Sequence, residues 1–152
     1  MTHRLVIMRH ASAAMVAASD SLRPLTERGV QEAHRSSCAF PFAPSVIYYS
    51  PYLRAQQTAA ILASYYPYAE LKEASWLTPE TNPARVVDQL SSVDCDIALV
   101  SHQPLVGSLA ALLIHGNARY SHDVPFLSPA CMLELKADVF QAGCADLINT
   151  II

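Results

Sequence analysis

Arg9 and His10 follow directly on a short apolar run, and this pair has the clearest potential for chemistry in the chain. The run, residues 5–8, is rich in branched side chains and is typical of a buried central strand. Polar residues after such a strand lie at its carboxyl end, where open α/β sheets bind ligands. An arginine can hold an anion with its planar donors, and a histidine is a nucleophile that titrates near neutrality. The pair therefore predicts a phosphate site whose histidine can attack phosphorus.

A second segment repeats this arrangement further along the chain. The strand predicted at residues 46–49 runs into Ser50 and Pro51, which suit the N-cap and the first position of a helix that we expect to end near Tyr66. Arg54 then falls in the first turn, near the positive end of the helix dipole. This segment therefore supplies a second arginine at the end of a strand.

A third segment supplies a second histidine. The strand predicted at residues 97–100 ends just before His102, and Pro104 begins the next predicted helix. If the three strands are parallel and adjacent, their polar residues converge on one crevice. The four predicted catalytic residues are Arg9, His10, Arg54 and His102. We expect the arginines to clamp phosphoryl oxygens and His102 to donate a hydrogen bond as an imidazolium.

Residues 8–11, 50–58 and 101–107 resemble the three signature motifs of the histidine phosphatase superfamily, which has a phosphoglycerate-mutase-like fold. Residues 17–26 and 77–79 narrow the resemblance to its SixA-like branch of small bacterial phosphohistidine phosphatases. The resemblance implies a metal-independent enzyme without a cofactor that forms a covalent phosphohistidine on its nucleophile. It also implies that the substrates are histidine-phosphorylated proteins, such as phosphotransfer domains or phosphocarriers.

The sequence departs from many relatives at two places. Ala11 stands where most of the superfamily has glycine, and the only candidate for a general acid is Glu80, which lies outside any recognisable acid motif. A missing acid favours a phosphohistidine substrate, because an imidazole leaves phosphorus with less need of a proton than an alkoxide does. Asp20 and Arg23, in the loop after the first strand, are predicted to line the rim of the site and contact the substrate. Gln103 is a further candidate for substrate binding.

Composition limits the other possibilities. A chain of 152 residues with 52% hydrophobic and 15% charged residues is predicted to form one ordered domain, residues 1–152. The order of strands and helices predicts a three-layer α/β/α sandwich with a mostly parallel central sheet and an antiparallel edge hairpin. A net charge of −3 argues against nucleic acid as a partner. No signal sequence or membrane span is recognisable, and no metal-binding pattern appears. We therefore expect a cytoplasmic monomer that binds neither membrane nor metal.

Two local expectations concern packing. The helix after Thr26 is expected to turn Val30, Ala33, His34, Ser37 and Cys38 inward. The four cysteines (Cys38, Cys95, Cys131 and Cys144) form no C-x-x-C pair, and we expect them to be reduced and buried.

Two other functions remain open from the sequence alone. One is a phosphatase of the same superfamily that acts on small phosphate monoesters, which a well-placed Glu80 would favour. The other is a non-catalytic regulator that binds phosphohistidine, against which the complete set of four residues speaks.

Overall fold

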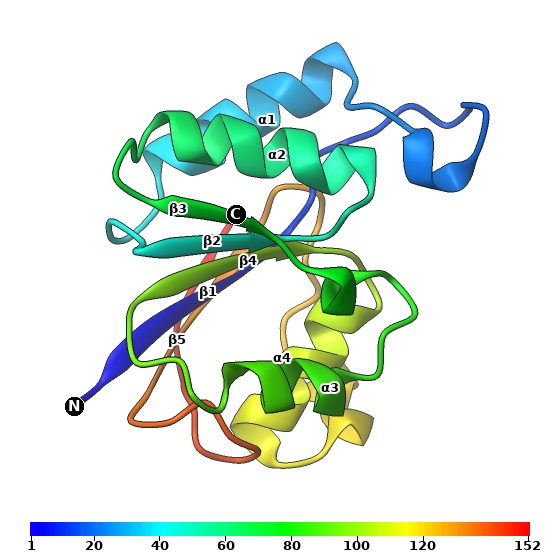
Figure 1. Ribbon diagram of the computed structural model, residues 1–152. Helices are drawn as coiled ribbons and strands as arrows, with labels where there is room; N and C mark the ends of the chain where they lie inside the picture. The colour runs from blue at the N-terminus through cyan, green and yellow to red at the C-terminus, as the bar shows by residue number, and fades with distance from the viewer.

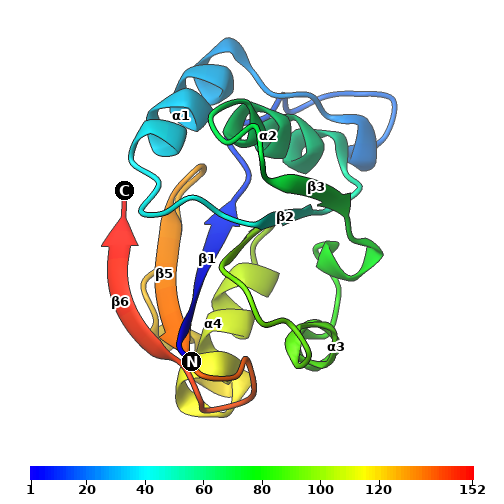
Figure 2. The same cartoon turned by 60° about the vertical axis from the view of Figure 1, so that its left-hand side comes forward.

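Six strands form one mixed sheet in the order β3-β2-β4-β1-β5-β6 in the computed structural model, which describes residues 1–152. Strands β1 to β4 are parallel to one another, β5 is antiparallel to β1, and β6 is antiparallel to β5. The predicted parallel sheet with an antiparallel edge hairpin is confirmed, and Figure 2 shows β5 and β6 side by side at that edge. The strands span His3–Arg9 (β1), Val46–Tyr49 (β2), Glu70–Glu73 (β3), Ile97–Ser101 (β4), Met132–Ala137 (β5) and Asp146–Ile151 (β6).

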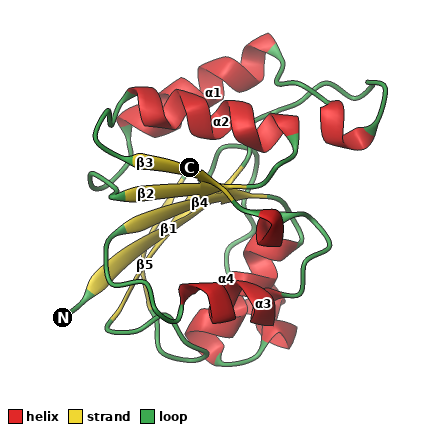
Figure 3. Cartoon of the chain, in the orientation of Figure 1, coloured by secondary structure: helices red, strands yellow, loops and turns green.

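Helices cover both faces of this sheet. In Figure 1, α1 (Glu27–Cys38) and α2 (Leu53–Ser64) lie above the sheet, and α3 (Pro83–Leu90) and α4 (Leu105–His115) lie below it. Figure 3 shows the resulting three layers, which confirm the predicted α/β/α sandwich. Three short 3₁₀ turns complete the chain: η1 (Asp20–Leu22), η2 (Ser75–Leu77) and η3 (Ala118–Asp123). No helix has the length and apolar character needed to cross a membrane.

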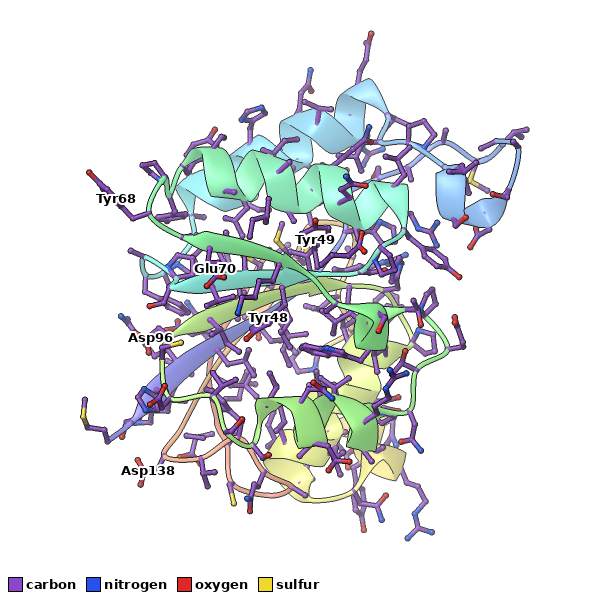
Figure 4. The ribbon with its side chains drawn as sticks, viewed as in Figure 1. Tyr48, Tyr49, Tyr68, Glu70, Asp96 and Asp138 are labelled. Atoms are coloured by element: carbon purple, nitrogen blue, oxygen red, sulfur yellow. The ribbon has the colours of Figure 1, made fainter.

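The central strand β1 is buried on both faces, which explains its continuous apolar run. Leu5 and Ile7 pack into the core on the side of α3 and α4, whereas Val6 and Met8 pack into the core under α1 and α2. Figure 4 shows the same alternation in β2, where Tyr48 and Tyr49 point to opposite sides of the sheet. This double burial fixes β1 firmly and so fixes the position of the residues at its carboxyl end.

The inward face predicted for α1 is confirmed for Ala33 and Ser37 but is wrong for Val30, His34 and Cys38. The predicted start of the helix at Thr26 is confirmed. Thr26 caps the helix by accepting a hydrogen bond from the backbone N–H of Gly29. The residues that face the interior are Gly29, Ala33 and Ser37, while Val30, His34 and Cys38 are exposed. A side chain at position 29 would meet the Ser12 carbonyl oxygen, because a Cβ atom there would lie 2.0 Å from it. Close approach to the loop after β1 thus selects small residues on this face.

The cysteines also differ in part from expectation. All four are free, and Cys131 is buried, but Cys38 and Cys144 are exposed and Cys95 is half-buried. The prediction that all four are buried is therefore wrong for Cys38 and Cys144. Cys38 is exposed because the inward face of α1 is rotated away from it.

Candidate active site

The carboxyl ends of β1, β2 and β4 meet in register at one edge of the sheet. Arg9 pairs with Ser101 across β1 and β4, and Tyr49 pairs with Val100 across β2 and β4. Two backbone hydrogen bonds continue this alignment beyond the strands, from His10 N–H to the Ser101 carbonyl and from Ser50 N–H to the Val100 carbonyl. The sheet therefore brings the three predicted segments to one place.

His10 is the residue at the centre of this edge. Its Nδ1 lies 2.7 Å from the carbonyl oxygen of Ala11, and its Nε2 accepts a hydrogen bond of 3.3 Å from Nε of Arg54. A carbonyl can only accept, so Nδ1 carries the proton and Nε2 carries the lone pair. Burial, together with the cationic side chains around it, lowers the pKa of His10 from its ordinary value to about 4. The ring is therefore neutral near pH 7, as a nucleophile must be.

Arg54 lies in the first turn of α2, as predicted, and is almost fully buried. The structure differs in how this helix begins. Tyr52, and not Ser50, occupies the N-cap position, and the regular helix starts at Leu53. The guanidinium of Arg54 lies 5.0 Å from the centre of the Tyr52 ring. Helix α2 thus begins two residues later than expected. The Ser50 hydroxyl accepts a hydrogen bond of 3.3 Å from the Tyr52 N–H and also has a partner outside the helix.

That partner is His102, which lies directly after β4. The Ser50 hydroxyl lies 2.7 Å from Nε2 of His102, and the rings of His102 and His10 are 5.0 Å apart. Burial, followed by the neighbouring His10 and Arg54, lowers the pKa of His102 to about 3. His102 is therefore neutral near pH 7 in the free site, and its charge beside a bound phosphoryl group stays a prediction. A neutral His102 still has one N–H to donate.

Arg9 completes the group of four. It donates a hydrogen bond of 3.1 Å to the carbonyl oxygen of Leu127, and its guanidinium lies 5.8 Å from the centre of the exposed Phe126 ring. Two buried nitrogens in the group have no hydrogen-bond partner within the protein, namely Nε of Arg9 and Nδ1 of His102. The structure thus brings the four predicted residues to one edge of the sheet and leaves two of their polar atoms unsatisfied.

The rim residues Asp20 and Arg23 lie over this group. In Figure 1 the loop after β1 carries the short blue helix η1 beyond the amino end of α2, and these two elements are in contact. Asp20 forms ion pairs with Arg54 at 3.3 Å and with Arg23 at 3.0 Å. Asp20 therefore contacts Arg54 directly and Arg23 contacts Asp20, and contact of either residue with a substrate stays a prediction.

Gln103 and Glu80 are less closely connected to the group of four. Gln103 lines a groove between α4 and η3 together with His122 and Phe126. Glu80 is exposed in the turn after η2 and forms no hydrogen bond or ion pair with any of the four residues. The proposed roles of Gln103 in binding and of Glu80 as an acid stay predictions.

The sequence does not predict two residues that position the site. Ser50 is expected to be a helix cap, although it directly follows a strand, which is the feature that identifies His10 and His102 as site residues. Thr58 is buried in α2, accepts a hydrogen bond of 3.0 Å from the Ala11 N–H, and donates one of 2.8 Å to the Arg54 carbonyl. It therefore ties the loop that holds His10 to the helix that holds Arg54.

The low pKa of His10 gives a direct prediction for the folded protein. A histidine in an unfolded chain titrates near pH 6.5. We expect His10 to titrate near pH 4 instead, because burial and nearby cations disfavour its charged form. The ring should stay neutral as the pH falls through 6.5 and take up its proton only near 4. NMR titration of the histidine ring signals, assigned with His10→Ala, measures this; a midpoint near 6.5 would contradict the neutral, buried nucleophile.

The comparisons with known proteins agree with this geometry. A family model described as "Histidine phosphatase superfamily (branch 1)" matches residues 5–91. "Phosphohistidine phosphatase SixA" of Escherichia coli (strain K12) is 34% identical over 126 residues, which cover 75% of this chain and 76% of that protein. A solved structure of "the protein histidine phosphatase SixA complexed with tungstate" superposes with a TM-score of 0.82 at 27% identity and covers 97% of this chain and 96% of that one.

A second curated relative acts on a different kind of molecule according to its name. "5''-phosphoribostamycin phosphatase" of Niallia circulans is 32% identical over 106 residues, which cover 63% of this chain and 50% of that protein. The similarity thus extends to a phosphatase named for a small phosphorylated molecule, although it spans less of either chain.

Proposed function

The chain belongs to the histidine phosphatase superfamily, and from this premise we propose that it removes phosphate from histidine-phosphorylated proteins through a phosphohistidine formed on His10. The observation that carries the proposal is the state of His10. Its ring is neutral, Nδ1 is fixed on a backbone carbonyl, and the lone pair of Nε2 lies beside Arg54. This is the arrangement that in-line attack on phosphorus requires.

The proposed reaction has two steps. In the first, Nε2 of His10 forms a bond to phosphorus while the bond from phosphorus to the substrate histidine breaks. The substrate leaves as neutral imidazole when its second ring nitrogen carries a proton, so no acid from the enzyme is needed. In the second step, water attacks phosphorus while the bond from phosphorus to Nε2 breaks. Both protons of the water stay with the phosphate product, and Nε2 recovers its lone pair. Both steps pass charge to the phosphoryl oxygens, which need donors.

Arg9, Arg54 and His102 would supply those donors. The two unsatisfied nitrogens, Nε of Arg9 and Nδ1 of His102, support this proposal, since a buried donor without an acceptor costs about 1–3 kcal/mol and a phosphoryl oxygen would provide the acceptor. For His102, a neutral ring that accepts from the Ser50 hydroxyl at Nε2 would present N–H at Nδ1. Two arginines neutralise the phosphoryl charge in this mechanism, so we propose that the reaction needs no metal ion.

The exposed position of Glu80 supports a phosphohistidine substrate over an ester. A general acid must lie within hydrogen-bond reach of the leaving atom, and Glu80 is exposed and forms no hydrogen bond or ion pair with Arg9, His10, Arg54 or His102. Expulsion of an alkoxide without a proton is slow, whereas a protonated phosphohistidine releases a weakly basic nitrogen. Small phosphate esters are the alternative substrate class, because one relative of this chain is named as a 5''-phosphoribostamycin phosphatase.

A comparison of substrates tests the proposed function. We expect kcat/KM on a histidine-phosphorylated phosphotransfer domain to exceed that on a panel of sugar and nucleoside phosphates by more than about 100-fold, a difference of about 3 kcal/mol at the transition state. Glu80→Gln should change the phosphohistidine reaction by less than about twofold, because no step of it uses this carboxyl group.

Two outcomes would contradict the proposed function and favour another one. Higher efficiency on esters together with a collapse of activity in Glu80→Gln would favour the small-molecule phosphatase. Binding of the phosphorylated domain without turnover would favour a non-catalytic regulator.

A further inference from the structure

All three nitrogens of the Arg54 guanidinium already donate hydrogen bonds to the protein itself. Nε donates to His10, Nη1 donates to the backbone carbonyl of Asp20 at 2.7 Å, and Nη2 donates to the Asp20 carboxylate at 3.3 Å. An arginine that binds a phosphoryl group uses two parallel N–H bonds at once. Asp20 therefore accepts from one of the two N–H groups on each Nη, the nitrogens that an incoming phosphoryl group needs, and leaves the second N–H of each free of protein partners.

The loop that carries Asp20 is held by backbone contacts at its base and is exposed to solvent at its tip. At the base, Ala13 pairs with Leu25, and the Ala14 N–H donates to the Pro24 carbonyl at 2.8 Å. Residues 15–20 between these anchors are exposed, and Asp20 is the residue of this tip that reaches Arg54. The backbone contacts at the base do not involve Asp20, so the contact between Asp20 and Arg54 can open without breaking them.

Arg23 holds Asp20 in the charged form beside Arg54. Arg23 donates to the Ala14 carbonyl at 2.6 Å through Nε and to the Asp20 carboxylate at 3.0 Å through Nη1. This hydrogen bond from Arg23, together with the charge of Arg54, lowers the pKa of the Asp20 carboxyl below its ordinary value. Asp20 is therefore an anion near neutral pH and interacts with Arg54 in the way that a phosphoryl oxygen would.

We propose that Asp20 is a built-in competitor of the phosphoryl group for Arg54, and that it lowers the affinity of the site for free phosphate and other small oxyanions. The proposal rests on the proposed function in placing the phosphoryl group at Arg54. An oxyanion at the two Nη groups of Arg54 must share these donors with the Asp20 carboxylate or displace it. Its binding is therefore weakened by repulsion from that carboxylate or by the loss of the carboxylate's contact with Arg54. A protein substrate meets the same competition but also binds through surface outside the phosphoryl site. Product phosphate has no such surface and leaves more readily.

The test is the affinity of small oxyanions for variants at position 20. In Asp20→Asn the amide has nearly the same shape but no charge, so we expect the Kd of tungstate and of inorganic phosphate, measured by calorimetry, to fall by about 3- to 5-fold, the upper part of the range for an exposed ion pair. Asp20→Glu keeps the charge and should stay within about twofold of the unmodified protein. Asp138→Asn removes one charge beside the amino end of β1, far from this loop (Figure 4), and should leave the Kd unchanged.

The outcomes separate this inference from the proposed function. Equal or weaker oxyanion binding in Asp20→Asn would overturn the competition, and so would equal effects of Asp20→Asn and Asp20→Glu. Failure of the unmodified protein to hydrolyse phosphohistidine would overturn the proposed function. It would leave the measured order of oxyanion affinities as an independent test of Asp20.

Discussion

Replacement of His10 by alanine is expected to lower the rate of phosphohistidine hydrolysis by more than about 1000-fold, equivalent to about 4 kcal/mol of transition-state stabilisation. The variant has no group that can accept the phosphoryl group, because the neighbouring His102 has its Nε2 engaged by Ser50. Single-turnover assays with a phosphorylated phosphotransfer domain measure the loss. His34→Ala is a matched control, since His34 is exposed on α1 and contacts only Tyr65 among hydrogen-bonding groups.

A control must show that His10→Ala is still folded. His10 is almost fully buried, so its removal could reduce stability as well as chemistry. Circular dichroism spectra and thermal unfolding of His10→Ala and His10→Asn answer this, the second variant keeping a polar group in the space. Residual activity above a tenth of the original in a folded variant would exclude His10 as the nucleophile.

Arg54→Ala is expected to reduce kcat/KM by about 100- to 1000-fold, as loss of a preorganised charged donor does. Arg54 is buried beside Nε2 of His10, where charge developing on phosphoryl oxygens would lie. Arg54→Lys should recover little of this loss, because a lysine cannot supply two parallel N–H bonds. Arg85→Ala, at an exposed position on α3, is the control. Normal kinetics and normal inhibition by tungstate in Arg54→Ala would remove this arginine from the site.

The parts of the fold set by strong local patterns could be predicted from the sequence. The apolar run of β1 identifies a strand that is buried on both faces, and its end places Arg9 and His10 at the edge of the sheet where the proposed site lies. Similarly, Asn82 and Pro83 mark the start of α3, where the Asn82 side chain accepts from the Ala84 N–H. At both places a feature of the local sequence determines the local structure, so it can be predicted from the sequence alone.

The parts that depend on contacts between distant segments could not be predicted. The inward face of α1 is set by the approach of Gly29 to Ser12, which hydrophobic periodicity does not reveal. Ser50 satisfies the rule for a helix cap, but its hydroxyl interacts with His102, which lies 52 positions away in the chain. The neutral state of His102 follows from burial beside His10 and Arg54 and thus from the assembled site.

The covalent intermediate on His10 is the central claim, and trapping it is the most direct test. The protein is mixed with a ³²P-labelled histidine-phosphorylated domain, quenched at alkaline pH within the first turnover, and digested for analysis of the labelled peptides. We expect the label on the peptide that contains His10, and no label in His10→Ala. Label that passes from substrate to water with no phosphorylated His10 at any time during turnover would contradict a phosphohistidine intermediate at this residue.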